Sequence, residues 1–144
     1  MQTVQQKIEA LFVEAVVAAF GEELGLAFQI IDDCLDLVGE EEVVGKSVGT
    51  DVEDGKVTLP VLHVYASADQ DLRDRIRDVY TRPGLEHRAR VLRETVDLEP
   101  GLIFARTRAE GLVERALQRL TVLDDGPAKR TLERIGDFVL GRNW

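Results

Sequence analysis

The sequence is poor in cysteine and aromatic residues, and it lacks a long uninterrupted apolar run. Cys34 is the one cysteine among 144 residues, so an internal disulfide is impossible and a reducing compartment is the simpler prediction. The most apolar stretch, residues 10–31, is interrupted by Glu14, Glu22 and Glu23, which argue against a membrane span. The N-terminus also lacks the basic start of a secretory signal. These absences together predict a soluble, cytoplasmic protein.

The sequence also has fewer basic than acidic residues. The formal net charge is −9, and the arginines between Arg73 and Arg134 are interleaved with aspartate and glutamate. A chain without a concentrated basic face repels nucleic acid, so nucleic acid is not an expected partner. An acidic protein can still bind a polyanion when metal cations mediate the contact.

Apolar residues recur with helical spacing near the N-terminus. The stripe consists of Val4, Ile8, Leu11, Phe12, Ala15 and Ala19. Val13, Val17 and Phe20 make the second half of this helix apolar on nearly every side, so we expect it to be buried. Gly21 is expected to loosen or end the helix. A second apolar run, residues 24–37, follows it and ends in a group of aspartates.

Glycine and proline break the pattern over residues 39–60, which predicts a long loop of the kind that is often functional. Further helices are predicted over 61–65, 71–80 and 85–95, then a long one from the Glu99-Pro100-Gly101 start, and a last one with Pro127 in its first turn. The sequence shows no alternating strand pattern. We therefore predict an all-α helical bundle in which residues 1–144 form a single domain.

Three aspartates stand near the end of the predicted 24–37 helix. Asp32 and Asp36 are four residues apart, so they point the same way about 5–6 Å apart, with Asp33 displaced around the axis. Carboxylates that face one way repel each other, and a magnesium ion would relieve the repulsion. Spacing alone leaves a solvated acidic surface equally possible, as at Asp124-Asp125, which precede a Gly-Pro turn.

Two glycine-lysine pairs follow the aspartates in the predicted loop. Glycine lets a backbone approach a phosphate closely, and lysine offers it a point charge. The full pattern is Phe28-Gln29-Ile30-Ile31-Asp32-Asp33-Cys34-Leu35-Asp36, Gly45-Lys46, Gly49-Thr50-Asp51 and Gly55-Lys56-Val57-Thr58-Leu59-Pro60. In order and spacing this pattern resembles the second aspartate-rich region of the trans-isoprenyl (polyprenyl) diphosphate synthase family. Residues 7–12 resemble that family's lysine helix, and 116–120 and 132–142 its last two helices.

The resemblance implies a partial isoprenoid-synthase fold that lacks the N-terminal helices. It implies a magnesium-dependent prenyltransferase that condenses an allylic diphosphate with isopentenyl diphosphate. The implied metal ligands are Asp32, Asp33 and Asp36, with Asp32, Asp33 and Lys46 in the catalytic role. Lys7, Gln29, Lys46 and Lys56 are the implied substrate-binding residues, and Asp51 is implied to order the loop or to bond the lysines. Cys34, in contrast, is interpreted as a small buried apolar side chain.

One part of the family's pattern is absent. No second Asp-Asp-x-x-Asp occurs in the sequence, and neither does the arginine pair that follows the family's first motif. Three interpretations follow: a synthase completed by a homodimer or by a partner subunit, a non-catalytic subunit, or a truncated and inactive remnant. An acidic all-α interaction domain is the alternative that ignores the resemblance, and the lysine loop argues against it.

Overall fold

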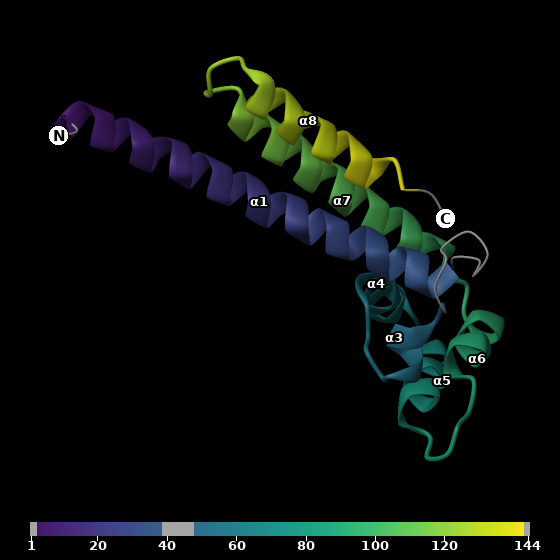
Figure 1. Cartoon of the computed structure of the whole chain (residues 1–144). Coiled ribbons are helices and arrows are strands. Elements are labelled where there is room, and N and C mark those ends of the chain that lie inside the picture. The colour runs from purple at the N-terminus through teal and green to yellow at the C-terminus, as the bar shows by residue number, and fades with distance from the viewer. Residues whose placement is uncertain (1–2, 39–47, 143–144) are drawn as a thin grey trace. The chain divides into compact units, whose positions relative to one another are not determined.

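The computed structural model describes residues 3–38 and 48–142, and within these ranges the regular structure is entirely helical. The helices are α1 (Val4–Val38), α3 (Thr50–Glu53), α4 (Leu59–Ser67), α5 (Gln70–Thr81), α6 (Arg88–Thr95), α7 (Glu99–Leu120) and α8 (Pro127–Leu140) (Figure 1). The predicted all-α fold class is confirmed. No helix in the described part of the chain combines the length and the apolar character that a membrane span requires.

The chain divides into two compact units. The first contains the residues of α1 up to Gln29 together with Arg108–Arg142, and the second contains the described residues of Ile30–Thr107. Both α1 and α7 therefore contribute residues to both units. The single domain expected from chain length stays a prediction.

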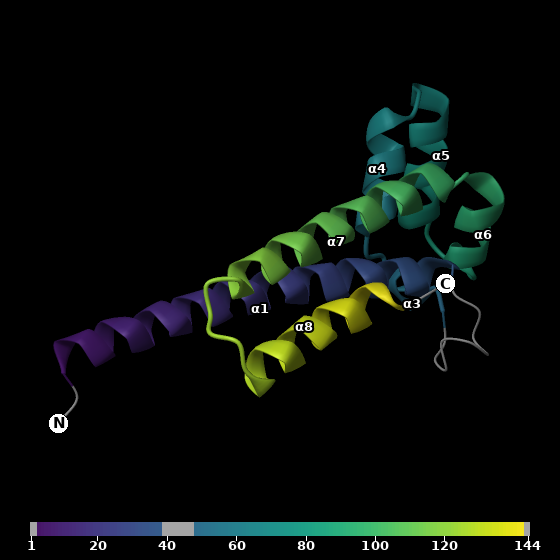
Figure 2. The same cartoon turned by 90° about the horizontal axis from the view of Figure 1, so that it is seen from above.

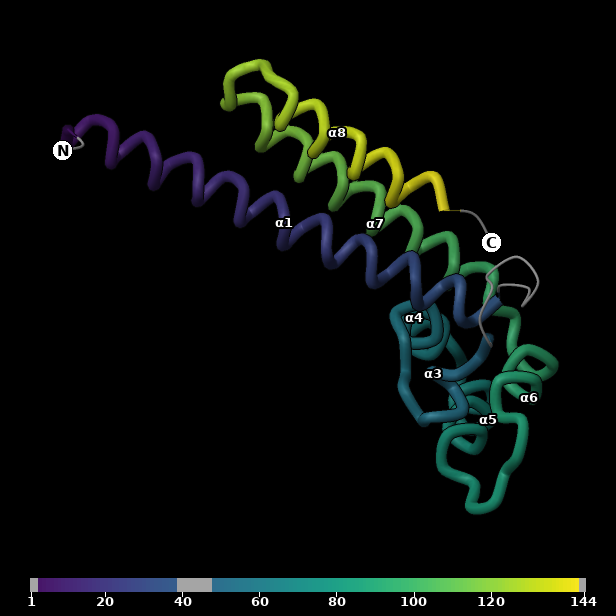
Figure 3. The backbone as a smooth tube through the Cα atoms, in the orientation of Figure 1, coloured from purple at the N-terminus to yellow at the C-terminus, as the bar shows by residue number. Residues whose placement is uncertain are grey.

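The expected end of the first helix at Gly21 was wrong. One helix, α1, runs through both Gly21 and Gly25 and ends at Val38 (Figure 3). A glycine inside a helix costs only about 1 kcal/mol relative to alanine. Burial of the neighbouring Phe20 and Leu24 side chains, which are 3% and 8% exposed, offsets that cost.

The expected burial of the second half of the first predicted helix was correct for Phe20 and wrong for Val13 and Val17. These two valines are 45% and 38% exposed, and the stripe that begins at Val4 is exposed as well. Within the first unit, the earliest turns of α1 extend past the turn that joins α7 to α8 (Figures 1 and 3), whereas Val13 lines an open pocket with Val122, Leu123 and Asp124 of that turn. Apolar periodicity marks a face suited to packing, but burial needs another element opposite that face.

In the first unit, the later turns of α1 pack with α8 and with the part of α7 from Arg108 onward. Figure 1 shows α8 running back beside α7, and the view of Figure 2 shows α1 between α7 and α8. Its buried side chains are Phe20, Leu24, Ala27, Ala109, Leu112, Val113, Ala116, Leu120 and Val139. Gly136 allows α8 to approach α7 closely, since a Cβ atom there would lie 3.0 Å from Leu117 Cδ2. Glu23 links α1 to α7: its carboxylate accepts hydrogen bonds from Arg119 Nε at 2.7 Å and Arg119 Nη2 at 2.9 Å.

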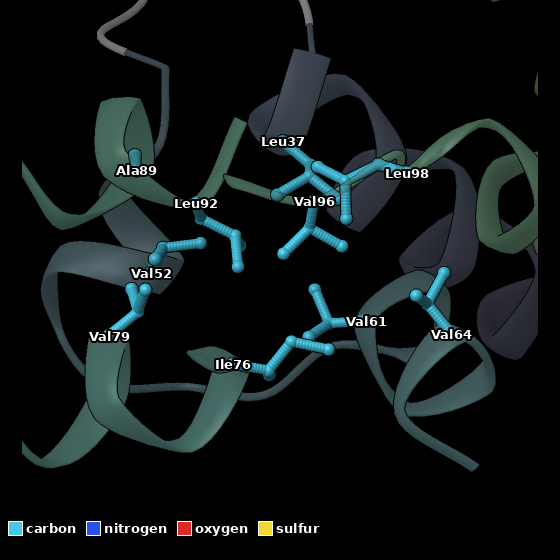
Figure 4. Packing of buried hydrophobic residues seen from close by; sticks show 10 residues of the cluster. All are labelled: Leu37, Val52, Val61, Val64, Ile76, Val79, Ala89, Leu92, Val96 and Leu98. Carbon is cyan, nitrogen blue, oxygen red and sulfur yellow. The ribbon is translucent and has the colours of Figure 1, made fainter. Parts of the chain in front are cut away.

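The second unit has an apolar core of its own, shown in Figure 4. The core side chains are Leu37, Val52, Val61, Val64, Ile76, Val79, Ala89, Leu92, Val96 and Leu98. The start of α7 packs closely on α4, because a Cβ atom at Gly101 would lie 2.2 Å from the Pro60 carbonyl oxygen. Part of the predicted 39–60 loop is helical, since it contains α3 and the first residues of α4. Residues 39–47 of that prediction lie outside the described residues.

The Glu23 ion pair predicts a pH-dependent stability. Hydrogen bonding to Arg119 holds the pKa of Glu23 below its ordinary value of 4.5, against the opposing effect of burial. A depressed pKa contributes stability above the ordinary pKa, and this stability is lost as the pH falls through the folded-state pKa. Glu23→Gln should lower the melting temperature by about 2–4 °C at pH 7. Thermal unfolding followed by circular dichroism should show the two curves converging below about pH 4, and a constant difference down to pH 3 would contradict this account.

Candidate functional site

Asp36 lies near the end of α1 with its side chain 3% exposed. Its Oδ1 accepts a hydrogen bond from Thr50 Oγ1 at 2.6 Å, and its Oδ2 accepts one from the Asp51 backbone N–H at 2.9 Å. Its carbonyl oxygen accepts a third from the Gly49 N–H at 2.6 Å. A buried carboxylate is stable only when it is hydrogen-bonded or paired. Asp36 therefore fastens the first turn of α3 to the end of α1.

Gly49 is the residue that makes this contact possible. Its φ of +80° lies in the left-handed region, and a Cβ atom there would lie 2.4 Å from the Cβ of Ala89 on α6. The same α3–α6 junction is held by Glu53, whose Oε1 accepts a hydrogen bond from the Ala89 N–H at 3.1 Å. Arg93 of α6 donates to the Leu37 carbonyl at 3.0 Å. The end of α1, the start of α3 and α6 are thus joined by direct contacts.

Lys56 is connected to the same group through Asp51. Lys56 Nζ lies 2.8 Å from Asp51 Oδ1 and 3.8 Å from Asp54 Oδ2. The hydrogen bond to Asp51, reinforced by the carboxylate charge, raises the pKa of Lys56 above its ordinary value, so the ammonium stays charged. The prediction that Asp51 bonds a lysine of the loop is confirmed for Lys56.

Asp32 and Asp33 are half-buried and lie in the same unit as Asp36. Cys34 beside them is buried, and this burial raises the pKa of its thiol to about 12, with the charge of Asp33 adding to the effect and that of Arg106 opposing it. The expected burial of the Cys34 side chain is confirmed, and a thiol with that pKa stays protonated near neutral pH. Within the described ranges, no group of three or more His, Cys, Asp or Glu side chains is placed to hold a metal ion.

The remaining predicted site residues are Lys7, Gln29 and Lys46. Lys46 lies outside the described residues. Lys7 and Gln29 are exposed residues of α1 in the first unit, whereas the three aspartates belong to the second. Their roles in substrate binding, like those of the aspartates in metal binding, stay predictions.

Sequence reasoning missed two arginines of this region. Arg106 of α7 is half-buried, and its charge acts on the Cys34 thiol. The contact of Arg93 with the Leu37 carbonyl could not be predicted, because the spacing of residues in the sequence does not indicate which side chain donates to the carbonyl at the end of a distant helix. Both arginines are distant from the aspartates in sequence, and only the folded chain relates them.

The two loop glycines provide a matched test of the junction. Gly49 and Gly55 both have positive φ, but a Cβ atom at Gly55 would meet nothing within 4 Å. Gly55→Ala should cost about 1 kcal/mol of unfolding free energy, which is the backbone strain alone. Gly49→Ala should cost about 3 kcal/mol or more, since it adds the collision with Ala89. Urea unfolding of both variants measures the difference, and equal losses would contradict the packing described.

The chain matches known proteins of one family. The Polyprenyl synthetase family model matches residues 2–97. A short chain isoprenyl diphosphate synthase from Methanothermobacter thermautotrophicus is 37% identical over 128 residues, which cover 89% of this chain and 39% of the relative. The chain therefore spans about two fifths of the length of the curated relatives that it matches.

Solved structures match over a similar share. Geranylgeranyl pyrophosphate synthetase from Pyrococcus horikoshii superimposes with a TM-score of 0.76 and 30% identity, covering 90% of this chain and 39% of that one. A polyprenyl synthase from Caulobacter crescentus, complexed with calcium and isoprenyl diphosphate, gives a TM-score of 0.81 with 28% identity, covering 92% and 40%. The agreement of sequence and fold over most of the chain shows that it belongs to the polyprenyl synthetase family.

Proposed function

We propose that this chain forms the part of a prenyl diphosphate synthase site that carries the second aspartate-rich motif, and that it binds the diphosphate group of an isoprenoid with magnesium. The observation that carries the proposal is the loop fastened to the aspartate helix. Asp36, Gly49 and Asp51 hold the segment that leads to Lys56 against the end of α1. The contacts of Asp36 and the Asp51–Lys56 ion pair thus connect the aspartate motif to a lysine of the loop.

The donor chemistry of the site suits magnesium. Asp32 and Asp33 offer carboxylate oxygens and are half-buried, whereas Asp36 is 3% exposed. Magnesium in phosphate sites is bound by one or two carboxylates together with waters and phosphate oxygens. We therefore propose Asp32 and Asp33 as the ligands of the metal, and Asp36 as the residue that positions them and the loop. When bound, the metal would neutralise charge on the diphosphate as it departs.

The lysines of the loop would supply fixed positive charge near the diphosphate. Lys56 is 63% exposed and held beside Asp51, so its ammonium is available to an anion at the surface. Lys46 is proposed for the same role from its place in the motif. A diphosphate bound between metal and lysine would be stabilised electrostatically as a leaving group.

Full catalysis, the condensation of an allylic diphosphate with isopentenyl diphosphate, is proposed to need more of the fold than this chain provides. The relative from Caulobacter crescentus was solved with isoprenyl diphosphate, and this chain covers 40% of it. A second set of carboxylates opposite Asp32 and Asp33 would have to come from another part of the fold, such as a partner subunit. In its absence the chain would bind the diphosphate without turning it over.

Magnesium-dependent diphosphate binding tests the proposal. Titration calorimetry with inorganic diphosphate, with and without magnesium, should show binding only when the metal is present. Asp32→Asn and Asp33→Asn should each weaken that binding by about tenfold or more, because a ligand charge is removed. Asp124→Asn is the matched control, since Asp124 is an exposed aspartate outside the site, and it should bind as the parent does.

The free energy of unfolding should distinguish the proposed positioning residue, Asp36, from the proposed metal ligand Asp32. Asp36→Asn should lower the free energy of unfolding by about 1–3 kcal/mol, because a side-chain amide cannot accept both hydrogen bonds. Asp32→Asn should lower the free energy of unfolding less than Asp36→Asn does, because Asp32 is half-buried and Asp36 is 3% exposed. Binding that does not depend on magnesium, or that survives in both Asp32→Asn and Asp33→Asn, would overturn the metal site. Turnover of an allylic diphosphate by the chain alone would overturn the need for a partner.

A further inference from the structure

Tyr80, in the last turn of α5, carries a buried hydroxyl group. Among the residues that the structure describes, this hydroxyl has no hydrogen-bond partner. Burial raises the pKa of Tyr80 to about 12, and the negative charge of Asp51 adds to the effect. The hydroxyl therefore stays protonated near neutral pH and can donate a hydrogen bond. A buried donor without an acceptor is unfavourable, so its presence in the second unit calls for a physical reason.

The end of α5 is held close to α3, the helix that contains Asp51. Helix α6 packs on both, and its Arg88 donates from Nη1 to the Val79 carbonyl oxygen at 2.6 Å. Val52 and Val79 are the chain neighbours of Asp51 and Tyr80, and both belong to the buried core shown in Figure 4. The tyrosine and the aspartate are therefore brought together by elements of one unit.

A cavity of about 250 Å³ lies beside the Tyr80 side chain. The residues that line it are Val57, Leu62, Tyr65, Ile76, Arg77 and Tyr80. Val57 follows Lys56 in the chain, so the cavity borders both the tyrosine and the segment that carries the lysine. Protein interiors are otherwise closely packed, and a cavity at this place leaves the Tyr80 ring room to shift.

The Asp51 carboxylate depends on Lys56 in this structure. Its side chain is 20% exposed, and Lys56 Nζ donates to its Oδ1 at 2.8 Å. Lys56 itself is 63% exposed, and an ion pair with so exposed a partner contributes little to stability. An anion at the surface can therefore draw the ammonium away. The carboxylate that stays behind is mostly buried and then needs another donor.

We propose that the Tyr80 hydroxyl is the second donor for the Asp51 carboxylate, and that it bonds this carboxylate when Lys56 leaves it. The exchange moves no proton: a neutral donor replaces a charged one, and the charge of Lys56 becomes available to the diphosphate. Tyr80 is thus a positioning residue that keeps the loop ordered while its lysine is in use. The assignment of the diphosphate as the anion that draws Lys56 away rests on the proposed function.

A double-mutant cycle without any ligand tests the exchange. Lys56→Met removes the first donor and keeps an unbranched side chain. In the parent chain, Tyr80→Phe should leave the equilibrium constant of unfolding unchanged or lower it, since an unpaired hydroxyl is removed. In the Lys56→Met chain, Tyr80→Phe should raise that constant by about tenfold, because the hydroxyl then bonds a carboxylate. Adding Asp51→Ala should abolish this difference, and urea unfolding measures every variant.

Tyr65→Phe is the matched control. Tyr65 lines the same cavity, but its hydroxyl already accepts a hydrogen bond from Arg77 Nη2 at 3.1 Å. Its substitution should change the unfolding constant by the same factor with and without Lys56. It also leaves Tyr80 as the one tyrosine of the chain, so absorption difference spectra report on that hydroxyl. In the Tyr65→Phe chain, Lys56→Met should shift the tyrosine band to longer wavelength, as happens when a phenol donates to a carboxylate.

Diphosphate binding tests whether the exchange serves the proposed site. Titration calorimetry with inorganic diphosphate and magnesium should show about fivefold weaker binding for Tyr80→Phe and unchanged binding for Tyr65→Phe. Unchanged binding by Tyr80→Phe, when the parent chain does bind diphosphate, would overturn the exchange. So would a Tyr80→Phe effect on unfolding that is equal with and without Lys56, or a tyrosine band that does not shift. A parent chain that binds no diphosphate would instead refute the proposed function, and the cycle would then decide by itself whether Tyr80 bonds Asp51.

Discussion

Burial of the Asp36 carboxylate is the constraint on which the arrangement of the second unit depends. A carboxylate that is 3% exposed must have hydrogen-bond donors, and the chain brings them back from residues 49–51 after the aspartate helix has ended. That return path demands a left-handed residue in contact with Ala89, which Gly49 alone can supply without a collision. Asp51 is thereby placed to hold Lys56. The contact of one carboxylate thus orders the start of α3 and its junction with α6.

The three aspartates of the motif differ in burial for this reason. Asp36 is 3% exposed and both of its oxygens accept hydrogen bonds, while Asp32 and Asp33 are half-buried and are the ones that we propose for the metal. Local sequence does not reveal this division, since all three are aspartates near the end of one helix. The surrounding structure decides it by covering one and leaving the others accessible. Cys34, inside the same motif, is buried as well, and this burial raises the pKa of its thiol to about 12.

Helix α1 takes part in both units and leaves part of its surface uncovered. Its later turns pack in the first unit and continue into the aspartates of the second, whereas its early turns expose Val4, Ile8 and Leu11. Members of the family that this chain matches are longer, and the chain covers 39% of the relative from Methanothermobacter thermautotrophicus.

The sequence by itself determined the helical class, most helix positions after Pro60 and the family. These features depend on local causes: apolar period, proline and glycine at turns, and a motif whose residues are neighbours in the chain. The helix continues through Gly21 because a single glycine destabilises a helix by less free energy than the burial of the neighbouring side chains contributes. Only the tertiary structure decided that Val13 and Val17 are exposed, that Asp36 is an anchor and that Arg106 lies within electrostatic reach of Cys34. The burial of a side chain and its hydrogen-bond partners depend on which distant segment packs against it. The spacing of residues along one helix does not indicate which segment that is.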